Sequence, residues 1–125
     1  MKRIILIAVF FVTTVIGVMS QTSLNQRILF AADSTNVSES QMAQVEVLVD
    51  YLRNNPAQNI IIAGFTSSRT PANLVDAITQ KRADAVKELL VQKYGIDPQR
   101  LLAVGVGVST RYDVPEFNEV VSFMK

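Results

Sequence analysis

The stretch from Asn59 to Phe65 is rich in β-branched side chains and contains no charged residue. An apolar run of this length without polar alternation predicts a strand covered on both faces. On both sides of it the apolar residues recur at helical spacing instead, before Asn55 and again from Thr70 to about Tyr94. A strand between two such helices predicts that the helices pack on a sheet.

Local signals mark where the two helices begin and end. Ser38 with Gln41 three residues later matches a capping box at the start of the first helix. The pair Thr70-Pro71 is typical of an N-cap followed by the first helical residue. Gly95 suits the left-handed conformation that ends many helices, so the second helix is expected to stop just before it.

Three further strands are predicted from short apolar runs bounded by turn residues, at Arg27–Phe30, Leu101–Val108 and Asn118–Met124. The resulting order is β-α-β-α-β-β, and the sequence shows neither an internal repeat nor a linker. A chain of 125 residues has the size of a single domain. The pattern therefore predicts one α+β domain.

The N-terminus matches a secretory signal peptide. Lys2 and Arg3 precede an apolar stretch of 16 residues, and the small residue Ser20 allows cleavage directly after it. The alternative is an uncleaved membrane anchor, but the stretch is shorter than the roughly 20 residues that a spanning helix needs. We therefore expect residues 1–20 to be a signal peptide and residues 21–125 to be an exported domain without a membrane span.

The composition excludes several classes of site. The chain has no Cys and no His, which excludes disulfide frameworks, thiolate metal sites, cysteine nucleophiles and histidine-based triads. A net charge of +1 provides no broad basic face for nucleic acid. No pair of carboxylates is placed for acid–base chemistry. The sequence thus predicts a protein that is not an enzyme and that uses neither a metal nor a cofactor.

Arg82 interrupts the apolar side of the second helix. At the angular spacing of an α-helix, Val75 and Leu89 lie within about 20° of it, and Ile78 and Val86 lie within about 40°. An arginine is almost never fully buried without a partner. Either its stem packs on the core while its head reaches solvent or an internal acid, or the guanidinium offers its planar donors to a carboxylate at the mouth of a groove. The helical pattern leaves both interpretations open.

Several short motifs follow one another in the order found in a known family. Gly64-Phe65-Thr66-Ser67 is followed, fifteen residues after its end, by Arg82-Ala83, and then by Tyr94-Gly95-Ile96 and Gly105-Val106-Gly107. In this order and spacing they resemble the C-terminal peptidoglycan-binding domain of outer-membrane protein A. The resemblance extends over about residues 27–125. It implies an OmpA-like βαβαββ sandwich, in which two helices pack on one mixed four-stranded sheet.

The resemblance also implies a binding site. In that family an Asp and an Arg hold the diaminopimelate of the peptidoglycan stem peptide, the Asp at its ammonium and the Arg at its carboxylate. Arg82 matches the Arg, whereas Ser67 stands in place of the Asp and Val75 in place of a ligand-side Asn. Thr66 and Ser68 complete the implied pocket. The final strand has neither arginine of the family's Asn-Arg-Arg-Val pattern.

The function implied by the resemblance is non-covalent association with peptidoglycan in the periplasm, at the cell wall or the outer membrane. The loss of the Asp removes a charge-assisted hydrogen bond worth about 1.5–3 kcal/mol, which weakens binding by roughly tenfold to a hundredfold. A nearby acid such as Asp76 could substitute for it. The alternative is a structural or adaptor module that keeps the fold, has lost peptidoglycan binding and docks a protein partner of the cell envelope.

Overall fold

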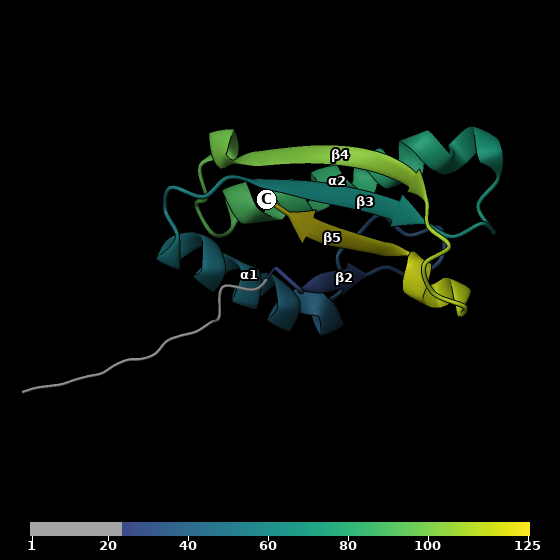
Figure 1. Ribbon diagram of the computed structural model, residues 1–125, viewed down its shortest axis with the longest axis horizontal. Helices are drawn as coiled ribbons and strands as arrows, with labels where there is room; N and C mark the ends of the chain where they lie inside the picture. Colours follow the sequence, from purple (N-terminus) through teal and green to yellow (C-terminus); the bar gives the residue numbers. More distant parts are fainter. Residues whose placement is uncertain (1–23) are drawn as a thin grey trace, which may run out of the picture.

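The structure is a computed structural model that describes residues 24–125 of the chain (Figure 1). The predicted signal peptide, residues 1–20, and its cleavage position lie outside the described residues. The strands and helices follow the predicted order, with short 3-10 turns between them. They are β2 (Arg27–Leu29), α1 (Met42–Asn54), β3 (Ile60–Thr66), α2 (Val75–Gln92), β4 (Leu101–Val108) and β5 (Val120–Met124).

The four strands form one mixed sheet in the order β2-β5-β3-β4. β3 and β4 are parallel and are connected through α2, whereas β5 is antiparallel to both of its neighbours, β2 and β3. The last strand of the chain therefore lies between the first and the second strand of the described domain (Figure 1). This arrangement confirms the predicted sandwich of two helices on a mixed four-stranded sheet.

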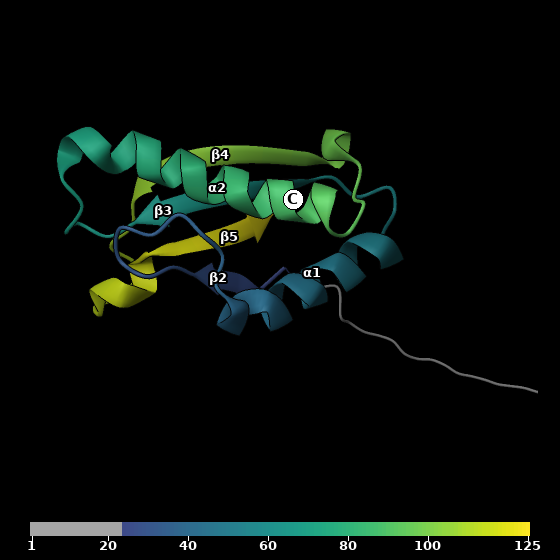
Figure 2. The ribbon, with the colours of Figure 1, turned by 180° about the vertical axis from the view of Figure 1, so that it is seen from behind.

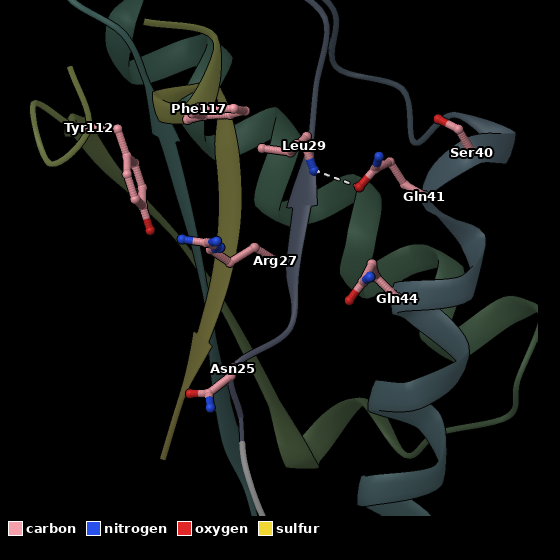
Figure 3. A pocket seen from close by; sticks show the side chains of 8 residues that line it. All are labelled: Asn25, Arg27, Leu29, Ser40, Gln41, Gln44, Tyr112 and Phe117. Atoms are coloured by element: carbon pink, nitrogen blue, oxygen red, sulfur yellow. Dashed lines mark hydrogen bonds between the residues drawn. The ribbon is translucent and has the colours of Figure 1, made fainter. Parts of the chain in front are cut away.

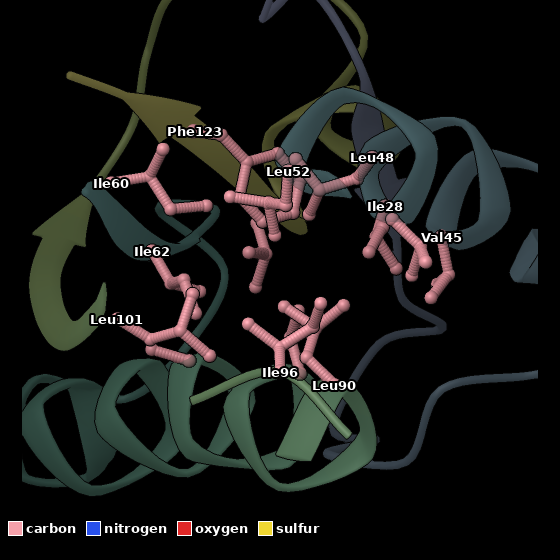
Figure 4. Packing of buried hydrophobic residues seen from close by; sticks show 14 of the residues in the cluster. Ile28, Val45, Leu48, Leu52, Ile60, Ile62, Leu90, Ile96, Leu101 and Phe123 are labelled. Atoms are coloured by element: carbon pink, nitrogen blue, oxygen red, sulfur yellow. The ribbon is translucent and has the colours of Figure 1, made fainter. Parts of the chain in front are cut away.

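Both helices lie on the same face of the sheet, as Figure 2 shows. The hydrophobic core fills the layer between the two helices and the sheet (Figure 4). Its fully buried members come from every layer of the sandwich and include Ile28, Val45, Leu48, Leu52, Ile62, Val86, Leu90 and Val121. The expectation that β3 is covered on both faces is wrong in one respect. Among the described residues no helix covers its other face, and Ile61 and Phe65 on that face are partly exposed. Because β3 is an inner strand paired with β5 and β4, these two side chains are still half-buried.

Two glycines allow α2 to approach the sheet closely. A Cβ on Gly64 would lie 2.1 Å from the carbonyl oxygen of Thr79, and a Cβ on Gly105 would lie 2.6 Å from the backbone nitrogen of Gln80. Both distances are far below van der Waals contact, so only glycine fits there. The close crossing fixes the first half of α2 over the ends of β3 and β4, and it places Arg82 beside the last residues of β3.

The side-chain caps predicted at the two helix starts are both absent, although Ser38 does directly precede the 3-10 turn that leads into α1. Ser38 makes no capping hydrogen bond, and its hydroxyl instead lies 2.9 Å from the hydroxyl of Ser40. The side chain of Gln41 accepts a hydrogen bond from the backbone nitrogen of Leu29 at 3.0 Å. The two side chains expected to form a capping box therefore bind elsewhere, and α1 begins only after a 3-10 turn over Glu39–Gln41.

The second helix begins later than Thr70, because a 3-10 turn over Ala72–Leu74 precedes α2. The hydroxyl of Thr70 is 2.6 Å from that of Thr66, so a contact within the loop takes the place of the predicted cap. The end of the helix follows the sequence more closely. Gly95 has a φ of +69°, which is the left-handed conformation expected of a residue that ends a helix.

Candidate functional site

Arg82 is fully buried, with 0% of its surface exposed. Its guanidinium joins three separate segments of the chain. The loop after β2 accepts two of its hydrogen bonds, from Nε to the carbonyl oxygen of Ser34 at 2.8 Å and from Nη2 to that of Ala31 at 3.2 Å. Nη1 donates to the carbonyl oxygen of Phe65 at 3.0 Å and to Oε1 of Glu119 at 2.8 Å. Of the interpretations left open by the helical pattern, the structure shows pairing with an internal acid.

Glu119 is the carboxylate partner of Arg82 and directly precedes β5. It is 2% exposed, and both of its oxygens accept hydrogen bonds. Oε1 accepts from the hydroxyl of Thr66 at 2.7 Å and from the backbone nitrogen of Ser67 at 3.3 Å, and Oε2 accepts from the hydroxyl of Ser67 at 2.8 Å. At the solvent side, Nη2 of Arg69 lies 3.7 Å from Oε2. We call Arg82, Glu119, Thr66 and Ser67 the carboxylate cluster.

The carboxylate cluster meets the conditions under which a buried ion pair is tolerated. Removing two charges from water is costly, and their attraction compensates only when the geometry is good and the remaining donors and acceptors are also bonded. Here the pair has a 2.8 Å contact. Two hydroxyls and a backbone nitrogen also donate to Glu119, and three carbonyl oxygens accept from Arg82, so four of the five guanidinium N–H groups are bonded. The ring of Phe30 covers the guanidinium, with its centroid 5.2 Å from Cζ of Arg82. The cluster therefore connects α2, the end of β3, the neighbouring start of β5 and the loop after β2.

Two opposing effects act on the pKa of Glu119. Burial raises it, because burial disfavours the charged carboxylate. The hydrogen bonds from Arg82, Thr66 and Ser67 lower it, and together they outweigh burial, so the pKa lies below the ordinary value of 4.5. Glu119 is therefore ionised at neutral pH and pairs with Arg82 as a carboxylate.

The lowered pKa predicts a pH-dependent contribution to stability. A carboxyl that binds its proton less tightly in the folded chain stabilises the fold above its unfolded pKa, near 4.5, and this contribution is lost as the pH falls through the lower folded value. We expect the difference in unfolding free energy between the wild type and Glu119→Gln to be constant from about pH 8 to 5.5 and to shrink below about pH 4.5. Urea unfolding across this range measures it. Parallel pH profiles for the two proteins below pH 5 would contradict the prediction.

The structure brings together three of the residues that the sequence placed in a site, namely Arg82, Thr66 and Ser67. Ser68 follows them and is exposed at the surface of the same loop. Val75 does not join them, because it is the first residue of α2 and lies two helical turns, about 10 Å, before Arg82 along the helix axis. It is partly buried.

Sequence reasoning missed Glu119 as the acid of the site and considered Asp76 instead. Asp76 is exposed in the first turn of α2, away from the pocket that Glu119 fills. A signal for Glu119 existed: it is a lone acid directly before the apolar run of the last strand, at a position where the resemblance calls for an arginine. The family motif indicates only that an arginine is absent at this position, and it gives no role to the carboxylate that replaces it.

A separate cleft of about 470 Å³ lies between β2, the start of α1 and the loop before β5 (Figure 3). Its lining residues are Asn25, Arg27, Leu29, Ser40, Gln41, Gln44, Tyr112 and Phe117. The guanidinium of Arg27 lies over the ring of Tyr112, 5.0 Å from its centroid. The cleft shares no residue with the carboxylate cluster.

Within residues 24–125, no group of three or more acidic side chains is arranged to hold a metal ion. Over the same residues, no helix has the length and apolar character needed to cross a membrane.

A sequence model of the OmpA family matches residues 29–120. This range includes both helices and the whole carboxylate cluster. The chain belongs to the OmpA family. Outer membrane porin F of Pseudomonas fluorescens is 39% identical to it over 80 residues, which cover 64% of this chain and 24% of that protein. The Peptidoglycan-associated lipoprotein of Legionella pneumophila is 31% identical over 88 residues, which cover 70% of this chain and 49% of that protein. The chain thus covers about a quarter of the first relative's length and about half of the second's.

Solved structures show the same fold. The crystal structure of the peptidoglycan-associated lipoprotein from Burkholderia pseudomallei matches with a TM-score of 0.70 at 24% identity, over 80% of this chain and 89% of that one. A putative MotB-like protein from Desulfovibrio vulgaris matches with a TM-score of 0.64, also at 24% identity, over 78% of this chain and 68% of that one. Both matches confirm the OmpA-like architecture.

Proposed function

We propose that this OmpA-family domain associates non-covalently with peptidoglycan in the periplasm, through a carboxylate of the stem peptide that binds at Arg82. One observation carries the proposal: the pocket already binds a carboxylate, that of Glu119. The guanidinium of Arg82, the hydroxyls of Thr66 and Ser67 and one backbone N–H surround it within 3.3 Å. A planar guanidinium with neighbouring donors is the arrangement that suits a carboxylate.

The relatives support the choice of ligand. Two of them are named peptidoglycan-associated lipoproteins. The family resemblance implies diaminopimelate as the ligand, and diaminopimelate has a carboxylate next to an ammonium. In the proposed complex the stem-peptide carboxylate lies beside Nη1 of Arg82, and Thr66 and Ser67 donate to it. Ser68 and the exposed Arg69 form the rim of the pocket. The role is binding at the cell wall, without catalysis.

Co-sedimentation with purified sacculi at neutral pH tests the proposal. We expect the wild-type protein to sediment with sacculi and free meso-diaminopimelate to reduce the bound fraction. Arg82→Lys keeps the positive charge but loses the planar pair of donors. Its affinity for sacculi is expected to fall about tenfold, which corresponds to the loss of one charge-assisted hydrogen bond. Melting curves establish that the variant is folded at the assay temperature.

The matched control is Arg53→Lys. Arg53 lies in the last turn of α1 and donates to the carbonyl oxygen of Tyr94 at an exposed position. It should leave sedimentation unchanged. Equal sedimentation of the wild type and Arg82→Lys would remove Arg82 from the site, and a wild type that stays in the supernatant would refute peptidoglycan binding.

The second candidate, an adaptor module that docks an envelope protein, is favoured by a different property of the same pocket. Arg82 is fully buried and its ligand position is occupied from within the chain. In addition, the edge strand β4 leaves Leu102, Val106 and Val108 exposed, and exposed apolar groups of this kind are common at protein interfaces. A wild type that does not sediment with sacculi would favour this candidate.

A further inference from the structure

We infer that Glu119 is an internal ligand of the pocket, which an external carboxylate must displace before it can bind Arg82. The inference deepens the proposed function and rests on it only for the identity of the external carboxylate. In the proposed function Arg82 receives the stem peptide; here the chain itself supplies a competitor for the same donors.

The first argument is occupancy. Nη1 of Arg82 is 2.8 Å from Oε1 of Glu119 and 3.0 Å from the carbonyl oxygen of Phe65. Both hydrogens of Nη1 are therefore engaged in hydrogen bonds. Arg82 has no exposed surface and Glu119 is 2% exposed. A second carboxylate has no room beside Nη1 while Glu119 is in place. Binding therefore requires exchange of one carboxylate for the other.

The second argument is how firmly the backbone presents Glu119. Its carbonyl oxygen accepts a hydrogen bond from the backbone nitrogen of Phe30 at 2.8 Å, directly beyond the β2–β5 pairing. The 3-10 turn Pro115–Asn118 precedes it and β5 follows it. A ligand tethered in this way has an effective concentration in the millimolar range or far above it. A free carboxylate at lower concentration is outcompeted.

The third argument is the place where exchange can begin. Arg69 is half exposed, with 50% of its side chain accessible, and it lies 3.7 Å from Oε2 of Glu119. Among the described residues, Glu119 contacts two cationic side chains, and Arg69 is the one that faces solvent. A carboxylate that leaves Arg82 toward solvent meets Arg69, so the displaced Glu119 keeps a positive partner.

The test removes the internal carboxylate and supplies an external one. Glu119→Ala deletes the atoms that acetate contains, so acetate can occupy the vacated position beside Arg82. We expect this variant to bind acetate about tenfold to a hundredfold more tightly than the wild type, the range expected for one charge-assisted hydrogen bond. Its melting temperature should rise with acetate, because a ligand that binds only the folded state stabilises it. Ionic strength is held constant with sodium chloride.

Three controls separate the pocket from nonspecific effects. Acetamide has the shape of acetate without its charge and should not raise the melting temperature. Glu116→Ala removes an exposed acid three residues earlier and should respond to acetate like the wild type. The double variant Arg82→Met/Glu119→Ala lacks the receptor and should not respond.

If Glu119→Ala does not fold in buffer, its recovery on refolding in acetate but not in acetamide is itself the expected result. Glu119→Gln keeps the size of the side chain and removes its charge, and it should also bind acetate more tightly than the wild type in calorimetric titration. Equal acetate affinity of the wild type and both variants, or a response of the double variant, would overturn the inference.

The outcomes also separate this inference from the proposed function. Sedimentation of the wild type with sacculi, together with no gain of acetate binding in the variants, leaves the function standing and removes the internal ligand. If the wild type does not sediment but the variants gain acetate affinity, the internal ligand is confirmed and the adaptor becomes the favoured function.

Discussion

Replacing Arg82 with methionine is expected to lower the free energy of unfolding by about 3–5 kcal/mol at pH 7. The substitution leaves Glu119 as a buried carboxylate without its cation. It also leaves the carbonyl oxygens of Ala31, Ser34 and Phe65 without the donor that bonds them now. Each unpaired buried polar group adds its own desolvation penalty. Urea unfolding followed by circular dichroism measures the loss.

Arg69→Met is the matched control, since Arg69 also faces Glu119 but is half exposed at 3.7 Å. Exposed pairs contribute about 0–1 kcal/mol, so this variant should be almost as stable as the wild type. Adding Glu119→Gln to Arg82→Met should restore part of the stability, because the two residues are coupled and their effects are not additive. A loss for Arg82→Met no larger than that for Arg69→Met would contradict the structural role of the pair.

Replacing Gly64 with alanine is expected to cost more than about 3 kcal/mol, above the usual range for an overpacked core. The added Cβ would meet the carbonyl oxygen of Thr79 at 2.1 Å and its carbonyl carbon at 3.0 Å. These are backbone atoms of α2, which no side-chain rotation can move away. The helix must shift from β3, and Arg82, one turn further along, shifts with it. Thermal and urea unfolding measure the effect.

Gly95→Ala separates this clash from the general effect of replacing a glycine. Gly95 has a φ of +69° and open space around its Cβ position, so only the left-handed backbone resists the substitution. That costs about 1–2 kcal/mol. Equal losses for Gly64→Ala and Gly95→Ala would show that the close approach of α2 to the sheet is not the cause.

The site was partly predictable from the sequence. Arg82 was identified because it stands among apolar residues on one side of a helix, and Thr66 and Ser67 were identified from their place in a family motif. The structure brings these three together. Whether the guanidinium meets a ligand or an internal acid was not predictable, because periodicity shows which side of a helix a residue occupies and not what lies opposite. The predicted helix caps were wrong for a local reason: the hydroxyls of Ser38 and Thr70 have capping chemistry, but each bonds to the hydroxyl of a residue nearby in the chain, Ser40 and Thr66.

Features that depend on neighbouring residues can be predicted from the sequence: the inner strand from its β-branched run, the periodicity of both helices, and the end of α2 shortly before Gly95. These follow from local sterics and from burial of one side of each element. The partner of Arg82, in contrast, depends on the tertiary structure. Glu119 is 37 residues further along the chain, and it reaches the pocket because β5 inserts between β2 and β3. The buried guanidinium of Arg82 pairs with the carboxylate that the strand order places within hydrogen-bond distance. Strand order depends on the whole sheet and not on neighbouring residues.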